Sequence, residues 1–164
     1  MRSADLLMAT TNVHWRRSTF SRSKKCVEPL EVTEGIASPD ERARLNLLPG
    51  DRVYRFRRIR HQDNQILLVE DVRLPATLFP KLLGSKGEAS DIGALAKKYG
   101  LLLGEAIERI SIEVASKTVA IALNVVVGTP VVRLDRVVHL RDGQPAECRT
   151  AYGVDSEKWS RLLS

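Results

Sequence analysis

Apolar and polar residues are interleaved along five segments of the chain, and this pattern predicts a β-rich fold. Residues 52–62 and 65–74 carry valine, isoleucine, tyrosine and phenylalanine on both arms of a predicted hairpin. Residues 130–141 and 144–154 form a second hairpin by the same criteria. The segment 105–116 alternates at Ile110, Ile112 and Val114 and predicts another strand. Residues 26–33 are a candidate first strand.

Short helices are predicted between these strands. Ser38-Pro39-Asp40-Glu41 has a capping serine, proline at the first helical position and acids in the first turn, so a helix should run to about Asn46. Ser90 should cap a helix to Tyr99, closed by Gly100. Further helices are expected at 117–124 and 155–163, and at most a helical turn at 76–83. Antiparallel strand pairs with helices between them indicate an α+β fold with a mainly antiparallel sheet and flanking helices.

Part of the sequence occurs twice, 78 positions apart. Leu45-Asn46, Gly50, Val53, Arg55, Arg58 and His61 return as Leu123-Asn124, Gly128, Val131, Arg133, Arg136 and His139. A repeat of this length is a supersecondary unit used twice. We therefore expect an internal pseudo-two-fold fold with a cleft between its halves.

Composition narrows the class of protein. The 43% hydrophobic content suffices for one core in 164 residues. The chain has neither an apolar run long enough to span a membrane nor an N-terminal apolar stretch of signal-peptide length, and Cys26 and Cys148 show no metal or disulfide spacing. We expect a cytoplasmic protein that holds no metal and no cofactor.

The positive charge is concentrated at the N-terminus. Residues 1–25 hold six basic residues and one acid, whereas residues 26–164 hold 20 basic and 19 acidic residues. We expect 1–25 to be a mostly disordered basic tail and 26–164 to be the folded domain. Such a tail can contact nucleic acid non-specifically, or simply be solvated.

The first hairpin contains the main candidate site. A two-residue turn at Asp63-Asn64 would place Glu70 opposite Arg57, whereas a three-residue turn would place it opposite Arg58. We favour the three-residue turn because the loop lacks glycine and asparagine tolerates positive φ. Arg58, Arg60 and Glu70 then share a face beside Tyr54 and Phe56. Two guanidinium groups there could bind a carboxylate or phosphate; the alternative is an internal Arg–Glu pair on a solvated face.

Three other residues complete the candidate site. Ser90 could offer a hydroxyl and backbone N–H groups to an anion, or merely cap its helix. Glu147 and Tyr152 lie on the returning strand of the second hairpin, where Tyr152 could close a pocket or belong to the core. The second hairpin has Val138 where the first has Arg60, so the two-arginine pattern is not duplicated. No catalytic Ser/His/Asp or Cys/His arrangement is visible.

These motifs in their order resemble the UTRA effector-sensing domain of GntR-type transcriptional regulators of the HutC subfamily. The resemblance covers roughly residues 26–160. It rests on Leu45–Val53, Arg58-Ile59-Arg60, Glu70, Leu74-Pro75, Ser90, Tyr99-Gly100, Gly128-Thr129-Pro130, Asp142–Pro145 and Glu147.

The resemblance implies a chorismate-lyase-like fold that binds a small, anionic metabolite between its halves. It carries Arg58, Arg60, Glu70 and Ser90 over as ligand contacts, with Tyr152 and Glu147 on the other side of the pocket. The family's Tyr-Arg-x-Asp ending reads Tyr152-Gly153-Val154-Asp155 here, so one expected arginine is missing. Regulators of this type are usually homodimers.

Only 25 residues precede the match, too few for a complete winged helix-turn-helix, so DNA binding would come from an attached or partner domain. The main hypothesis is an effector sensor without enzymatic activity. The alternatives are a free-standing chorismate-lyase-type enzyme and a basic-tailed nucleic-acid binder.

Overall fold

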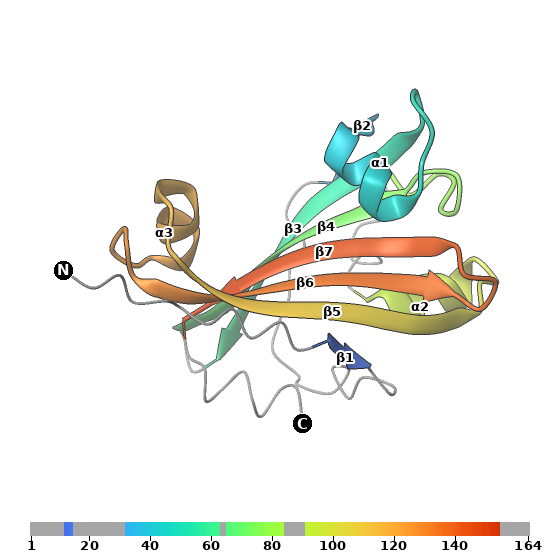
Figure 1. Ribbon diagram of the computed structural model, residues 1–164. Helices are drawn as coiled ribbons and strands as arrows, with labels where there is room; N and C mark the ends of the chain where they lie inside the picture. The colour runs from blue at the N-terminus through green and yellow to red at the C-terminus, as the bar shows by residue number, and fades with distance from the viewer. Residues whose placement is uncertain (1–11, 15–31, 63–64, 84–90, 155–164) are drawn as a thin grey trace.

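A computed structural model describes residues 12–14, 32–62, 65–83 and 91–154. Within them the strands form a seven-stranded, wholly antiparallel sheet in the order β1-β5-β6-β7-β4-β3-β2 (Figure 1). The strands are β1 (Asn12–His14), β2 (Thr33–Ile36), β3 (Arg52–Gln62), β4 (Gln65–Pro75), β5 (Leu103–Val114), β6 (Pro130–Leu140) and β7 (Pro145–Gly153). The helices are α1 (Pro39–Leu45), α2 (Ile92–Lys98) and α3 (Lys117–Leu123). The predicted α+β class with a mainly antiparallel sheet is confirmed.

The helices cover opposite faces of the sheet. Figure 1 shows α1 and α3 at the two ends of one face, with α2 on the other. Leu45 of α1 packs against Val53 and Cys148, and Leu123 of α3 packs near Val69. Leu95 of α2 packs against a cluster on the other side of the same strands, formed by Tyr54, Phe56, Val72, Leu74, Phe79 and Leu82. We refer to these sides as the α1/α3 face and the α2 face.

Local sequence signals account for the helix ends. Ser38 accepts a hydrogen bond from the Glu41 amide and Glu41 accepts one from the Ser38 amide, a reciprocal capping box. For α2 the predicted cap is wrong: Asp91, not Ser90, accepts from the Gly93 amide. An aspartate side chain one position later caps equally well and suits the positive end of the helix dipole. Ser90 itself lies outside the described residues.

Several backbone features of the sequence repeat recur in the structure. Asn46 ends α1 and Asn124 ends α3 in the left-handed conformation, with φ of 52° and 56°. Gly50 and Gly128 follow with φ of 92° and 88°, values that favour glycine. The order short helix, strand, strand also recurs as α1-β3-β4 and α3-β6-β7. The two-fold axis relating the copies stays a prediction.

The first hairpin has the predicted strand register, but its turn differs from the predicted one. Arg58 lies opposite Glu70, as expected, but Gln62 pairs with Gln65, which leaves two residues between the strands rather than three. A bulge supplies the shift, because His61 pairs with Ile66 while Arg60 pairs with Leu68. Leu67 is thus the extra residue that returns the arginines and Glu70 to one face.

Three predicted segments lie partly or wholly outside the described residues. Of the first predicted strand, at 26–33, only residues 32 and 33 are described, and β2 begins at Thr33. Within the tail predicted to be mostly disordered, residues 12–14 form β1 against β5. The predicted helix at 155–163 lies outside the described residues.

Candidate functional site

Seven charged side chains from five neighbouring strands gather on the α2 face of the sheet. Strand register places them on this face, since Glu108 pairs with Arg136, Arg136 with Arg149, and Arg58 with Glu70. Six of them are at most 7% exposed, and the Arg60 side chain is 19% exposed. We call this group the charged cluster: Arg58, Arg60, Glu70, Glu108, Arg136, Glu147 and Arg149.

Glu70 is the acidic centre of the cluster. Its Oε2 lies 3.1 Å from Nε of both Arg58 and Arg60, and Oε1 accepts a 2.9 Å hydrogen bond from Nη1 of Arg149. Burial raises the pKa of Glu70, but the positive charges of Arg149, Arg58 and Arg60 outweigh it and lower the pKa to about 2. Glu70 is therefore ionised at neutral pH and holds three guanidinium groups together.

Acidic and basic groups alternate from Glu70 toward β5. Arg149 Nε lies 3.7 Å from Glu147, and Arg136 Nε lies 3.5 Å from Glu108. Burial lowers the pKa of Arg136, and the neighbouring Arg149 lowers it further. Burial likewise lowers the pKa of Arg58, against the attraction of Glu70. An additional negative charge would therefore stabilise the charged forms of both arginines.

An apolar wall borders the charged cluster. The Arg58 guanidinium carbon lies 5.8 Å from the centre of the Phe56 ring. At this distance the face of an aromatic ring attracts a cation. Phe56 belongs to the cluster packed under α2, with Tyr54 and Leu95. The residues present thus combine guanidinium donors, carboxylate acceptors and an aromatic surface within one region.

The structure brings together four of the six predicted site residues. Arg58, Arg60, Glu70 and Glu147 share the α2 face. Tyr152 does not join them, because it pairs with Val69 and faces the α1/α3 side. Ser90 lies outside the described residues.

Sequence reasoning missed Arg149, Arg136 and Glu108 as members of the group. Alternation alone places Arg149 on the same face as Glu147, two residues away. The repeat also matches Arg136 with Arg58, so both signals were available. Alternation also places Glu108 on the same strand face as Ile110 and Ile112. No pattern in the sequence, however, showed which strand would lie beside β5.

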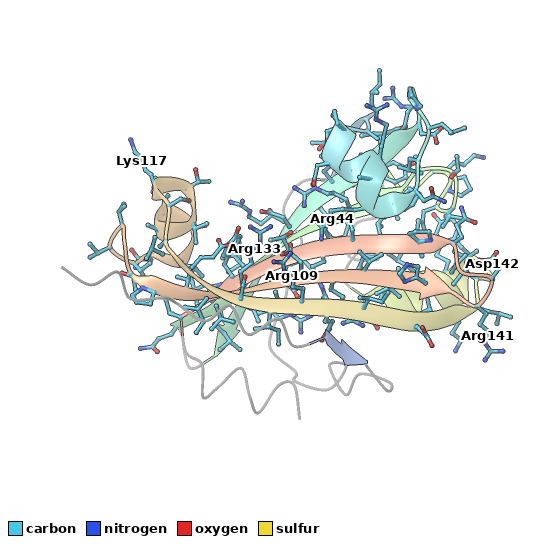
Figure 2. The ribbon with its side chains drawn as sticks, in the orientation of Figure 1. Arg44, Arg109, Lys117, Arg133, Arg141 and Asp142 are labelled. Atoms are coloured by element: carbon cyan, nitrogen blue, oxygen red, sulfur yellow. The ribbon has the colours of Figure 1, made fainter. Side chains whose placement is uncertain are left out.

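Tyr152 borders a cavity of about 250 Å3 between α3 and the sheet, on the face opposite the charged cluster. Val69, Val119 and Leu123 line its apolar part, and Arg57 and Asp71 form a bidentate ion pair at 2.8 and 3.1 Å. The Arg133 guanidinium lies 5.8 Å from the centre of the Tyr152 ring. Figure 2 shows Arg133 of β6 and Arg44 of α1 on this side of the sheet.

The chain matches the family model of the UTRA domain over residues 26–156. It belongs to the UTRA domain family. The match covers all the described strands from β2 to β7, and so includes the whole charged cluster.

Solved structures share the fold of this UTRA domain. A GntR-family transcriptional regulator from Enterococcus faecalis V583 is 25% identical, with a TM-score of 0.73 over 80% of this chain and 94% of that one. A ligand-binding domain from Bordetella bronchiseptica, assigned to a GntR-family regulator, is 23% identical, with a TM-score of 0.73 over 88% and 94%. PhnF from Mycobacterium smegmatis shares the fold at 19% identity, with a TM-score of 0.70 over 78% of this chain and 58% of that protein.

None of the helices in the described residues is long and apolar enough to cross a membrane. Across those same residues, His, Cys, Asp and Glu side chains form no group of three that could hold a metal ion.

Proposed function

We propose that this UTRA domain senses a small anionic metabolite and thereby controls DNA binding in a GntR-type transcriptional regulator of the HutC subfamily. The metabolite binds at the charged cluster on the α2 face. DNA contact comes from an attached or partner winged helix-turn-helix, and the working unit is a cytoplasmic homodimer without enzymatic activity. The family match supports the regulatory class, and the cluster supports the kind of ligand.

The observation that carries the proposal is the charge of the cluster. Four arginines face three glutamates among the described residues, and all but Arg60 are buried. Guanidinium groups are paired donors to carboxylate and phosphate, so a buried region rich in guanidinium favours a ligand that brings a negative group. The negative charge of Asp91 also raises the pKa of Arg149, as the smallest of the causes. Asp91 is exposed and caps α2, so it is not part of the cluster.

Arg60 is the residue best placed to meet the ligand. It shares Glu70 with Arg58, yet its side chain is 19% exposed where that of Arg58 is 2% exposed. Planar guanidinium groups bind carboxylate and phosphate through paired hydrogen bonds. Arg60 thus binds the anionic group, while Arg58, Glu70 and Arg149 fix its position. Glu147 accepts from ligand hydroxyl or amino groups, and Ser90 stays a candidate of second rank, whereas Tyr152 faces the other side of the sheet.

Ligand binding controls the protein only through differential affinity. An effector that prefers one arrangement of the dimer shifts the DNA-competent population by at most its preference for that arrangement. The charged cluster spans β3, β4, β5, β6 and β7, so a ligand there contacts both halves of the sheet. A ligand bound there can therefore change how the two halves of the sheet are positioned relative to each other.

A thermal-shift screen against anionic metabolites tests the proposal. The set should include sugar phosphates, amino-acid catabolites, urocanate, phosphonates and chorismate. A true effector at about a hundred times its dissociation constant should add roughly 2.7 kcal/mol to the free energy of unfolding. Turnover of chorismate by the chain would contradict the proposal in favour of the enzyme hypothesis.

A further inference from the structure

The two copies of the sequence repeat differ in the side chains that their helices turn toward the sheet. Both helices are capped by serine and end at a left-handed asparagine, so α1 and α3 can be compared position by position. With the repeat spacing of 78, Glu41 and Arg44 of α1 correspond to Val119 and Ala122 of α3. Two long charged side chains are thus replaced by two short apolar ones.

In the first copy the long side chains fill the space between the helix and the sheet. Glu41 lies 2.6 Å from Arg55 and 3.2 Å from Arg73, both of which belong to the sheet. Arg44 donates a 3.2 Å hydrogen bond to Thr150 of β7. These contacts tie α1 to three strands, β3, β4 and β7.

In the second copy part of the corresponding space is open. Val119 and Ala122 line the cavity of about 250 Å3 between α3 and the sheet, which we call the α3 cavity. Leu123, Val69 and Tyr152 also line it, and the first two of these are almost fully buried. An apolar cavity of about 150 Å3 is enough to hold benzene. The α3 cavity therefore has room for a small ring that carries a substituent.

The charged groups at the α3 cavity are already matched. Arg57 and Asp71, which line it, form a bidentate ion pair at 2.8 and 3.1 Å. The Arg133 guanidinium, 5.8 Å from the centre of the Tyr152 ring, donates to Asp135 at 2.8 and 3.2 Å. An anion would have to compete with Asp71 for Arg57, and a cation with Arg57 for Asp71. This balance of charge favours an uncharged molecule, in contrast to the charged cluster.

Two hydroxyl groups at the α3 cavity can orient such a molecule. Neither the Tyr152 hydroxyl nor the Thr118 hydroxyl makes a hydrogen bond with any residue that the structure describes. Burial raises the pKa of the Tyr152 phenol, so its hydroxyl stays protonated. A hydroxyl can both donate and accept a hydrogen bond. Apolar walls with a few polar groups are the usual composition of small-molecule sites.

We propose that the α3 cavity is a second binding site, for a small uncharged molecule with one ring and one hydrogen-bonding group. The ring packs against Val69, Val119 and Leu123, and the polar group bonds the Tyr152 hydroxyl. The site lies on the face opposite the charged cluster and does not depend on anion binding. Either site can therefore be shown or refuted without the other.

Benzyl alcohol, compared with benzoate, tests the site in the full chain. By methyl NMR, benzyl alcohol should shift the signals of Val69, Val119 and Leu123 until they saturate. Benzoate has nearly the same size but carries a charge, and it should bind about tenfold more weakly because its carboxylate must be desolvated or displace Asp71 from Arg57. Unshifted methyl signals would show a cavity that holds water alone. That result, or equal binding of benzoate, would overturn the proposal.

Two substitutions on α3 test the location of binding. Ala122→Met fills the α3 cavity with a side chain that favours helix, and it should abolish the shifts. Ile121→Met is the matched control, because Ile121 is 72% exposed on the same helix, and it should leave the shifts unchanged. Saturable shifts that persist in Ala122→Met would place the bound molecule elsewhere and contradict the assignment.

Tyr152→Phe tests the polar contact and stays decisive if Ala122→Met does not fold. Loss of one hydrogen bond should weaken benzyl alcohol binding about fivefold, while toluene, which lacks the hydroxyl, should bind parent and variant alike. Benzyl alcohol binding that is unchanged, or toluene binding that falls equally, would refute the role of the Tyr152 hydroxyl.

Discussion

Arg149 donates a 2.9 Å hydrogen bond to Glu70 across β7 and β4, which lie side by side at the centre of the sheet. Both residues are almost completely buried, at 4% and 1% exposed. One strand belongs to each half of the sequence repeat, so this contact joins the halves of the domain. The Glu70 carboxylate that positions Arg58 and Arg60 is thus itself held by a residue of the second half, Arg149.

Breaking this contact should be costly. Arg149→Met removes one of the guanidinium partners of a buried carboxylate, and we expect a loss of about 2–4 kcal/mol in the free energy of unfolding. A double-mutant cycle with Glu70→Gln, followed by urea denaturation, should give a coupling energy of about 1–3 kcal/mol. The same cycle on Arg52 and Glu34, which are 2.8 Å apart but more exposed, should give less than about 1 kcal/mol. Equal coupling in both cycles would contradict the role assigned to burial.

Glu41 should determine part of the acid sensitivity of the fold. Hydrogen bonds from Arg55, against the effect of burial, lower the pKa of Glu41 from 4.5 to about 2. A depressed folded-state pKa stabilises the protein above pH 4.5, and that stability is lost as the pH falls toward 2. Glu41→Gln should therefore flatten the fall in melting temperature between pH 5 and about 2. A parent and variant whose melting temperatures fall in parallel would show that the Arg55 contact contributes nothing.

Arg44 should link α1 to the strand that carries Arg149. Its Nη2 donates to the Arg149 carbonyl oxygen and its Nη1 to Thr150 Oγ1, each at 3.2 Å. Arg44→Met should lower the free energy of unfolding by about 1–2 kcal/mol, because these are partly buried hydrogen bonds from a charged donor. Thr150→Val in the same background should then cost less than it does alone. Strictly additive losses would indicate that the two residues act independently.

The Cys148 thiol should be unreactive in the folded protein. The side chain is fully buried between α1 and the sheet, and burial raises its pKa to about 11. The thiolate is the reactive form, so labelling by a disulfide reagent at pH 8 should follow unfolding. In a Cys26→Ser chain the labelling rate should rise steeply across the urea transition. Rapid labelling without denaturant would show that the packing of α1 opens readily.

Most of the fold could be predicted because its signals are local. Both hairpins, α1 and α3 follow from side-chain alternation, capping residues and the left-handed positions at Asn46 and Asn124. The prediction that Ser90 caps α2 was wrong because two adjacent residues, Ser90 and Asp91, offer the same capping chemistry. The bulge at Leu67 could not be predicted, because it depends on which of two registers packs better against the rest of the sheet.

The site was predicted only in part because burial is a tertiary property. Arg58, Arg60 and Glu70 lie in one hairpin, so one decision about register grouped them. Arg149 and Glu108 join that group only through the strand order, which places β7 between β4 and β6. Tyr152 is a candidate through its place on the second hairpin and through the resemblance, but its pairing with Val69 places it on the opposite face.

The anion-induced change in melting temperature of Arg60→Ala, compared with Arg52→Ala, tests the central claim most directly. Arg60 lies at the accessible side of the charged cluster, whereas Arg52 lies away from it and is paired with Glu34. With the metabolite that stabilises the parent chain most, Arg52→Ala should keep the full shift and Arg60→Ala should lose nearly all of it while still folding cooperatively. An equal shift in both variants would contradict an anion-binding site at Arg58, Arg60 and Glu70.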